Sequence, residues 1–118
     1  MTVQITAQTA DAPTPPVGQS DAVADMVGRV GEATGLLKAL AHDGRLLILC
    51  HLTAGERTVS ELEVLLGQRQ ATVSQQLARL REEGLVTCRP EGKSRRYSIA
   101  DPRAARVVGV LYDLFCDG

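Results

Sequence analysis

The sequence is poor in aromatic residues and has no long apolar run, and each shortage excludes a class of protein. Aromatic residues make up 3% of the 118 residues and tryptophan is absent, which argues against a base-stacking platform for single-stranded nucleic acid. No apolar stretch approaches the roughly 18–20 residues that cross a bilayer. What remains is a chain of one domain's size, whose apolar content of 44% suffices for a packed core.

Cysteine is also scarce, since the chain holds only Cys50, Cys88 and Cys116. Three cysteines so far apart cannot form a disulfide scaffold. The N-terminus has no basic segment followed by an apolar one, so we expect no signal peptide. Together these features predict a cytoplasmic protein with reduced thiols, in which cysteine pairing would serve chemical signalling.

The first 20 residues differ in composition from the rest of the chain. Residues 1–20 contain Pro13, Pro15 and Pro16, lack Lys and Arg, and have few large apolar residues. They are interpreted as a disordered arm that does not bind DNA by charge. Residues 21–118 are expected to form one domain, whose first helix begins after an N-cap at Ser20 or Asp21.

The periodicity of the domain predicts helices around a single β-hairpin. Two short helices joined by a tight turn containing glycine and followed by a hairpin are typical of a winged helix-turn-helix, a mainly α fold with a β wing (α+β). The apolar last helix predicts a dimer. In chain order the expected elements are a helix capped by Asp43, helices 59–66 and 70–83 with Gly84 as left-handed C-cap, strands 85–89 and 95–99, and a helix starting at Asp101 and Pro102.

The net charge of −1 conceals an uneven distribution. Between Arg69 and Arg96 lie seven basic and three acidic residues, a local charge of +4, which leaves −5 for the remainder of the chain. Because phosphate binding depends on the local field, this segment is predicted to be a DNA-binding face.

Within this segment the short and amide-bearing side chains of the second short helix can reach base edges, and the basic residues can contact phosphates. The alternatives are a solvated helix surface, or a winged helix used only for protein contacts, which would not need Arg95 and Arg96 beside the turn. The predicted base contacts are Gln70, Ala71, Ser74 and Gln75, and the predicted phosphate and wing contacts are Arg69, Thr72, Gln76, Arg89, Lys93, Arg95 and Arg96.

Three segments in order, 37–49, 72–86 and 89–99, resemble the ArsR/SmtB family, and the match covers about residues 22–117. The resemblance implies a homodimeric winged-helix repressor that leaves its double-stranded operator when an inducer binds, with a dimer interface formed by the first and last helices. One departure is Arg69, where the family usually has a capping Ser or Thr. The start of the recognition helix is therefore expected to be less securely capped.

Metal sensing is common in this family, but this sequence lacks the residues that usually bind the metal. Thr58, Val59 and Ser60 stand where the arsenic-type site has a Cys-Val-Cys triplet, and Arg103 and Leu114 stand where the zinc-type site has imidazoles. We therefore expect no metal and no cofactor. Ser60 and Ser74 also have no adjacent general base, and no glycine-rich phosphate loop is present, so an enzyme is not expected.

The placement of Cys50 and Cys116 instead resembles the SqrR/BigR branch of the family. That resemblance implies sensing of persulfides through a di- or polysulfide bridge between the two thiols, followed by release of DNA. Metal- or peroxide-responsive repression is the alternative, and Cys50 alone could be a small core residue. Cys88 is either an inward-facing strand residue or a third reactive thiol.

Overall fold

The structure, a computed structural model, describes residues 16–116, with side chains from residue 21 onward. The first 15 residues of the expected arm therefore lie outside the described residues. Contacts divide the chain into two units, one ending at Thr34 and one beginning at Gly35, and each is considered by itself. None of the helices in the described range is long and apolar enough to span a membrane.

Helix α1 spans Pro16–Leu40 and begins earlier than predicted. The expectation of an N-cap at Ser20 or Asp21, with an arm reaching residue 20, is wrong for residues 16–20, which are helical. Proline explains the earlier start, because its fixed φ suits the first turn of a helix. Before Thr34, the apolar side chains of α1 are exposed: Val23, Met26, Val27 and Val30.

Helix α2 spans Asp43–Thr53, and its N-cap is His42 rather than the predicted Asp43. The Gly44 N–H donates to His42 Nδ1 at 3.1 Å, so an imidazole takes the capping role expected of a carboxylate. Arg45 Nε donates to the Ala39 carbonyl oxygen at 2.7 Å. This bond satisfies one of the carbonyls left open at the end of α1 and connects the two helices.

The two helices of the predicted helix-turn-helix are α3, Val59–Leu66, and α4, Gln70–Glu82. Gly67, at φ 65°, allows the tight turn between them. The expected weak start of α4 is confirmed, since its N-cap Arg69 makes no side-chain capping hydrogen bond.

The predicted left-handed C-cap of α4 is also confirmed, because Gly84 has φ 76°. The Gly84 N–H donates to the Arg81 carbonyl at 2.9 Å, and the Leu85 N–H donates to the Leu80 carbonyl at 2.9 Å. This pair of bonds is the Schellman arrangement, and it directs the chain from α4 into the wing.

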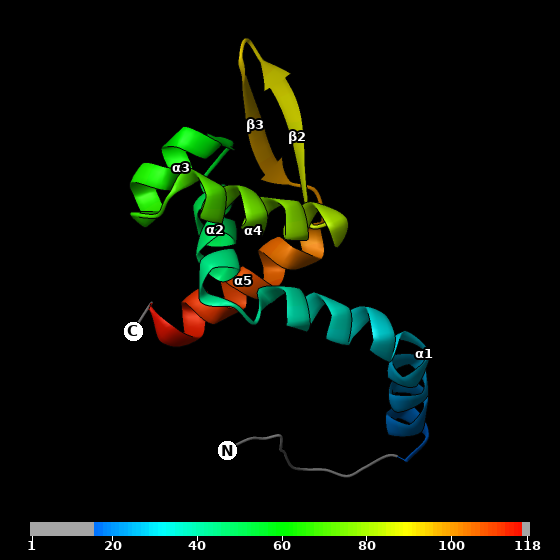
Figure 1. The fold of residues 1–118 in the computed structure, drawn as a ribbon. Helices are drawn as coiled ribbons and strands as arrows, with labels where there is room; N and C mark the ends of the chain where they lie inside the picture. The colour runs from blue at the N-terminus through cyan, green and yellow to red at the C-terminus, as the bar shows by residue number, and fades with distance from the viewer. Residues whose placement is uncertain (1–15, 117–118) are drawn as a thin grey trace. The chain divides into compact units, whose positions relative to one another are not determined.

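The wing is a three-stranded antiparallel sheet in the order β1-β3-β2. Strands β2, Val86–Glu91, and β3, Ser94–Ile99, form the predicted hairpin, which extends beyond α3 and α4 (Figure 1). The short strand β1, Arg57–Thr58, was not predicted, because two residues carry no period. Cys88 pairs with Tyr97 on the face that meets the core, and Arg89 pairs with Arg96 on the opposite face.

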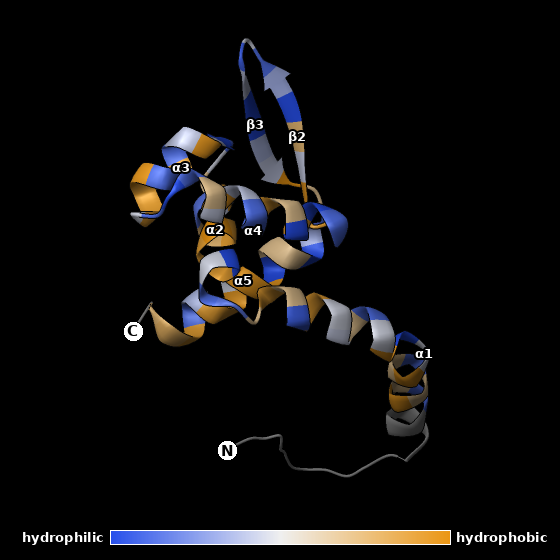
Figure 2. Cartoon of the chain, viewed as in Figure 1, coloured by the Kyte–Doolittle hydropathy of each residue, from blue (hydrophilic) through white to orange (hydrophobic). Residues whose placement is uncertain are grey.

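Helix α5, Pro102–Phe115, begins as predicted, with Asp101 as N-cap and proline in its first turn. Figure 2 shows hydrophobic residues along α5 and a hairpin that is largely hydrophilic. Ala104 and Val108 enter the core, whereas Leu114 and Phe115 are 70% and 80% exposed. The largest fully buried side chains of the core are Ile48, Leu49, Leu62, Val73, Leu77 and Leu80.

The core assignment predicts unequal effects of two substitutions on α3. Leu62→Ala, at a fully buried position, is expected to lower the free energy of unfolding by about 2–5 kcal/mol, since it leaves a cavity. Val64→Ala, at a position 82% exposed, should cost about 0.5 kcal/mol or less. Urea unfolding at equal protein concentration measures both, and equal destabilisation by the two substitutions would contradict the assignment.

Candidate DNA interface and thiol pair

Helix α4 turns one face to the core and the other to solvent. Val73, Leu77 and Leu80 are buried, so the opposite face carries Ala71 and Gln75, both exposed. Gln70 and Thr72, in the first turn, are also exposed. These four predicted contact residues are free to meet DNA.

Ser74 and Gln76 occupy the flanks of α4: Ser74 is half-buried, and Gln76 lies beside another helix. The Gln76 Nε2 lies 3.5 Å from the position that a Cβ on Gly44 would take, so this amide packs against the start of α2. Sequence spacing could not place Gln76 there, because the neighbour comes from a separate helix. The structure therefore brings together Ala71 and Gln75 on the exposed face and turns Gln76 toward the protein.

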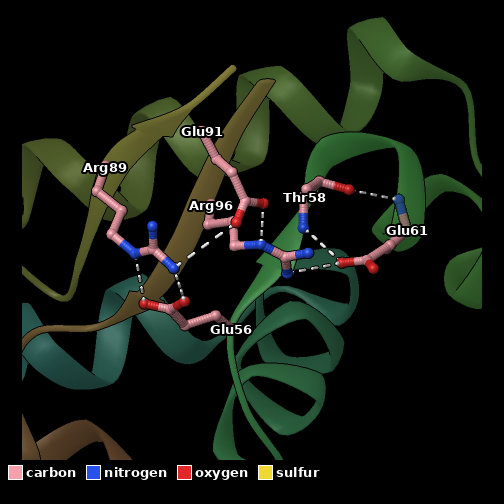
Figure 3. A network of polar contacts seen from close by, with 6 residues as sticks. All are labelled: Glu56, Thr58, Glu61, Arg89, Glu91 and Arg96. Atoms are coloured by element: carbon pink, nitrogen blue, oxygen red, sulfur yellow. Dashed lines mark hydrogen bonds and ion pairs between the residues drawn. The ribbon is translucent and has the colours of Figure 1, made fainter. Parts of the chain in front are cut away.

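The outer face of the sheet holds a network of arginines and carboxylates (Figure 3). Arg89 Nε donates to Glu56 Oε2 at 3.2 Å, and its Nη2 donates to Oε1 at 2.8 Å. Arg89 Nη2 also lies 4.0 Å from Glu91 Oε2. Arg96 Nε donates to Glu91 Oε1, and its Nη1 donates to Glu61 Oε1 at 3.5 Å. Two of the four arginines predicted to contact phosphates, Arg89 and Arg96, are therefore held by carboxylates.

Glu61 connects this network to the start of α3. The Thr58 N–H donates to Glu61 Oε1 at 2.8 Å, and the Glu61 N–H donates to Thr58 Oγ1 at 3.1 Å, which is a capping box. The hydrogen bond from the Thr58 backbone is the main reason that the pKa of Glu61 is lowered, and the Arg89 hydrogen bond lowers the pKa of Glu56. Both carboxylates therefore stay ionised to a lower pH than an ordinary glutamate.

Lys93 and Arg95 differ from the other two wing cations. Both are exposed, and neither forms an ion pair with a carboxylate in the part of the chain that the structure describes. Arg95 Nη1 instead donates to Cys88 Sγ at 3.6 Å. Of the four predicted wing contacts, these two are the cations available to a phosphate.

The network contains two carboxylates, Glu56 and Glu61, that the sequence pattern did not connect with the wing. The basic segment runs from Arg69 to Arg96, and Glu56 and Glu61 lie outside that interval. Including them lowers the charge of the segment and its partners from +4 to +2. The Thr-x-x-Glu spacing of Thr58 and Glu61 is a signal of capping in the sequence, but nothing local connects Glu56 with Arg89, 33 positions away.

The thiols of Cys50 and Cys116 come within electrostatic reach of each other. Cys50 is half-buried on α2 against the core, and Cys116 is exposed at the end of α5. Burial raises the pKa of Cys50 above its ordinary value, and the charge of Cys116 raises it further. Cys50 lines a cavity together with Tyr112 and Asp113, in the turn of α5 that precedes Cys116, so the fold brings near each other two cysteines that are 66 positions apart in the sequence.

A cavity of about 440 Å³ lies beside Cys50, between α2 and α5. Its wall includes Thr53 from α2 and Val108, Tyr112 and Asp113 from α5. Cys88, the third thiol, is half-buried against the core, as the inward-facing interpretation predicts. Within residues 21–116, no three His, Cys, Asp or Glu side chains gather in a way that could hold a metal ion.

Comparison with known proteins gives consistent matches. Residues 42–87 match the family described as bacterial regulatory protein, arsR family. A biofilm growth-associated repressor from Agrobacterium fabrum is 48% identical over 77% of this chain and 78% of its own length.

Two solved structures share the fold. The crystal structure of the transcriptional repressor BigR from Xylella fastidiosa has a TM-score of 0.75 at 44% identity, covering 78% of this chain and 94% of that one. The homodimeric winged helix-turn-helix DNA-binding domain of a possible ArsR-family regulator from Mycobacterium bovis has a TM-score of 0.67 at 33% identity, covering 75% of this chain and 82% of that one.

The environment of Cys50 predicts a pH dependence of alkylation. Because the thiolate is the nucleophile and the pKa of Cys50 is raised, its iodoacetamide reaction should reach half-maximal rate above the ordinary thiol value of about 8.5. Cys116→Ser removes the second cause of the shift and should lower this midpoint, while burial keeps it above the ordinary value.

Mass spectrometry of each cysteine across about pH 6–10 measures the midpoints. Cys88→Ser is the control, because Cys88 does not contribute to the shift and the Cys50 midpoint should stay unchanged. An unchanged midpoint in Cys116→Ser would show that the two thiols do not interact.

Proposed function

Since the chain belongs to the arsR family of bacterial regulatory proteins, it is a DNA-binding transcriptional repressor and not an enzyme, and we propose that it responds to persulfides. In this proposal, a bridge between Cys50 and Cys116 forms when a low-molecular-weight persulfide is present, and the repressor then releases its operator. The observation that carries the proposal is that Cys50 on α2 lines a cavity together with Tyr112 and Asp113, in the turn of α5 that precedes Cys116.

The DNA-bound form is proposed to be a homodimer. The apolar side chains that α1 and α5 leave exposed, such as Met26 and Phe115, would be covered in a dimer interface between these helices. Each α4 would then enter a major groove, with half-site centres about one helical turn apart. Ala71 and Gln75 would meet base edges, and Lys93 and Arg95 would meet phosphates.

The chemistry begins at the exposed thiol. The Cys116 thiolate attacks the outer sulfur of a persulfide RSSH, the S–S bond breaks, and the thiol RSH leaves, so that Cys116 becomes a persulfide. The Cys50 thiolate then attacks the inner sulfur of that persulfide, which forms the disulfide and releases hydrogen sulfide. The two cysteines are oxidised and the transferred sulfur is reduced, so no other oxidant is needed.

A longer bridge follows from the same exchange. If both thiols first become persulfides, attack of one on the other leaves three sulfurs in the chain that joins Cys50 and Cys116 and again releases hydrogen sulfide. The cavity beside Cys50 offers space for such an additional sulfur. A peroxide would also oxidise the pair to a disulfide, which makes a general redox-responsive repressor the second candidate.

The bridge would act on DNA binding through α2. This helix packs against α4, which carries the proposed base contacts, and against α5, whose C-cap is Cys116. A covalent link between α2 and α5 would therefore bias the position of α4 relative to the dimer interface. A loss of operator affinity of about 100-fold needs only about 2.7 kcal/mol of such coupling.

The persulfide proposal is tested with reduced protein and an operator duplex selected from a randomised pool. Glutathione persulfide should produce a bridged Cys50–Cys116 peptide in mass spectrometry and lower operator affinity on the order of 100-fold. Cys50→Ser and Cys116→Ser should keep their affinity, and Cys88→Ser is the matched thiol control. If both single variants still release the operator at the persulfide concentration that releases the wild-type protein, the proposal is overturned. If the wild-type protein releases the operator equally readily with hydrogen peroxide, general redox sensing is favoured.

The proposed DNA contacts predict two different phenotypes. Arg95→Ala should weaken binding to every duplex, and the slope of log K against log salt should flatten by about 0.9 for each phosphate no longer neutralised. Gln75→Ala should mainly relax base preference, since it removes an amide that can hydrogen-bond a base edge. Titrations of the selected operator and of single-base variants at several salt concentrations measure both effects, and reversed phenotypes would mean that the two roles are exchanged.

A further inference from the structure

The outer face of the wing carries a carboxylate belt, which consists of Glu56, Glu61 and Glu91. We propose that this belt holds Arg89 and Arg96 away from DNA and thereby limits the attraction of the wing for DNA of any sequence. The belt residues are then specificity-determining residues of the repressor, because they suppress binding that does not depend on base contacts.

The belt crosses the whole sheet. Glu56 lies just before β1 at one edge, and its partner Arg89 belongs to β2 at the other edge, so the pair reaches across β3. Arg96, on β3 between them, is bound by Glu91 and Glu61 (Figure 3). Each arginine therefore has two carboxylate partners drawn from different elements.

Stability accounts for only part of this arrangement. A single exposed ion pair typically contributes about 0–1 kcal/mol to stability, and a bidentate pair within a network, such as Arg89 with Glu56, contributes more. The effect of these ion pairs on DNA binding is larger. When an arginine is paired with a carboxylate, the negative charge of that carboxylate also approaches the DNA phosphates. Such a pair releases no additional counterion from DNA, and counterion release is the source of sequence-independent affinity.

Burial distinguishes Arg96 from the remaining cations of the wing. The Arg96 side chain is only 27% exposed, so a phosphate would have to displace both of its carboxylates to bind it. Lys93 and Arg95 are exposed. Four basic side chains of the segment from Arg69 to Arg96 have no carboxylate partner among the described residues. They are Arg69, Arg81, Lys93 and Arg95.

These four cations lie toward the two ends of α4 and at the tip of the hairpin. They can position α4 on the duplex without adding the charge of Arg89 and Arg96. Specificity is the ratio of operator affinity to affinity for other DNA, and a smaller sequence-independent contribution lowers the second of these. The belt thus favours discrimination between the operator and other DNA over attraction to DNA of any sequence.

Glu56→Gln is the substitution that tests the belt, because Glu56 is exposed and, unlike Glu61, does not cap a helix. It frees Arg89 from its bidentate partner. Glu63→Gln is the matched control, because this substitution changes the net charge by the same amount. Glu63 lies on α3 and has no ion pair with the wing among the described residues. The probe is a random-sequence duplex of about 30 base pairs, titrated at several salt concentrations by fluorescence anisotropy.

Glu56→Gln should steepen the plot of log K against log salt by about 0.9 for each arginine freed, and raise affinity for the random duplex on the order of tenfold at about 0.1 M salt. Glu63→Gln should change both quantities much less. In an Arg89→Gln background, Glu56→Gln should behave like Glu63→Gln, because Arg89 is no longer there to be freed.

Three results would overturn the proposal. Equal effects of Glu56→Gln and Glu63→Gln would mean that only net charge matters. Persistence of the Glu56→Gln effect in the Arg89→Gln background would mean that Arg89 is not the group held back. A loss of affinity for the random duplex in a Glu56→Gln protein that remains folded by circular dichroism would mean that the belt positions the wing for binding.

Discussion

Helix α2 is the element on which the arrangement of the Gly35–Gly118 unit depends. Its fully buried Ile48 and Leu49 lie in a single apolar cluster with residues of α3, α4, α5 and the wing. Because interiors are close-packed, a displacement of α2 cannot be absorbed by empty space and must move its neighbours. A helix with no proposed base contact of its own therefore controls the position of α4, and it also carries Cys50, one of the two thiols of the proposed bridge.

Local signals predicted most of the fold. The apolar period of 3.6 identified the helices, Gly84 marked the end of α4, and Asp101 with Pro102 marked the start of α5, because each of these features acts within one turn of chain. The early start of α1 and the cap at His42 were missed, since proline and imidazole are weaker signals than a serine or an aspartate.

The candidate DNA interface was less predictable, because its electrostatics are not local. The sequence identified Ala71 and Gln75 as exposed, because the helical period places them opposite the buried face of α4. It could not show that Gln76 packs beside Gly44, or that Glu56 binds Arg89 from 33 positions away. Counting charge along a chain therefore overstates the charge that a folded surface offers to a phosphate.

The two kinds of control proposed for this repressor operate on different contributions to DNA affinity. A thiol bridge between α2 and α5 changes the geometry in which α4 meets the groove, so it acts on base contacts and on the operator above all. The carboxylate belt changes only how many cations meet phosphates, so it acts on every DNA sequence alike. Because the belt lowers the sequence-independent contribution, a larger share of operator affinity depends on the geometry of α4. A modest shift of α2 then suffices to release the protein, and a sensor whose coupling is only about 1–3 kcal/mol becomes an effective switch.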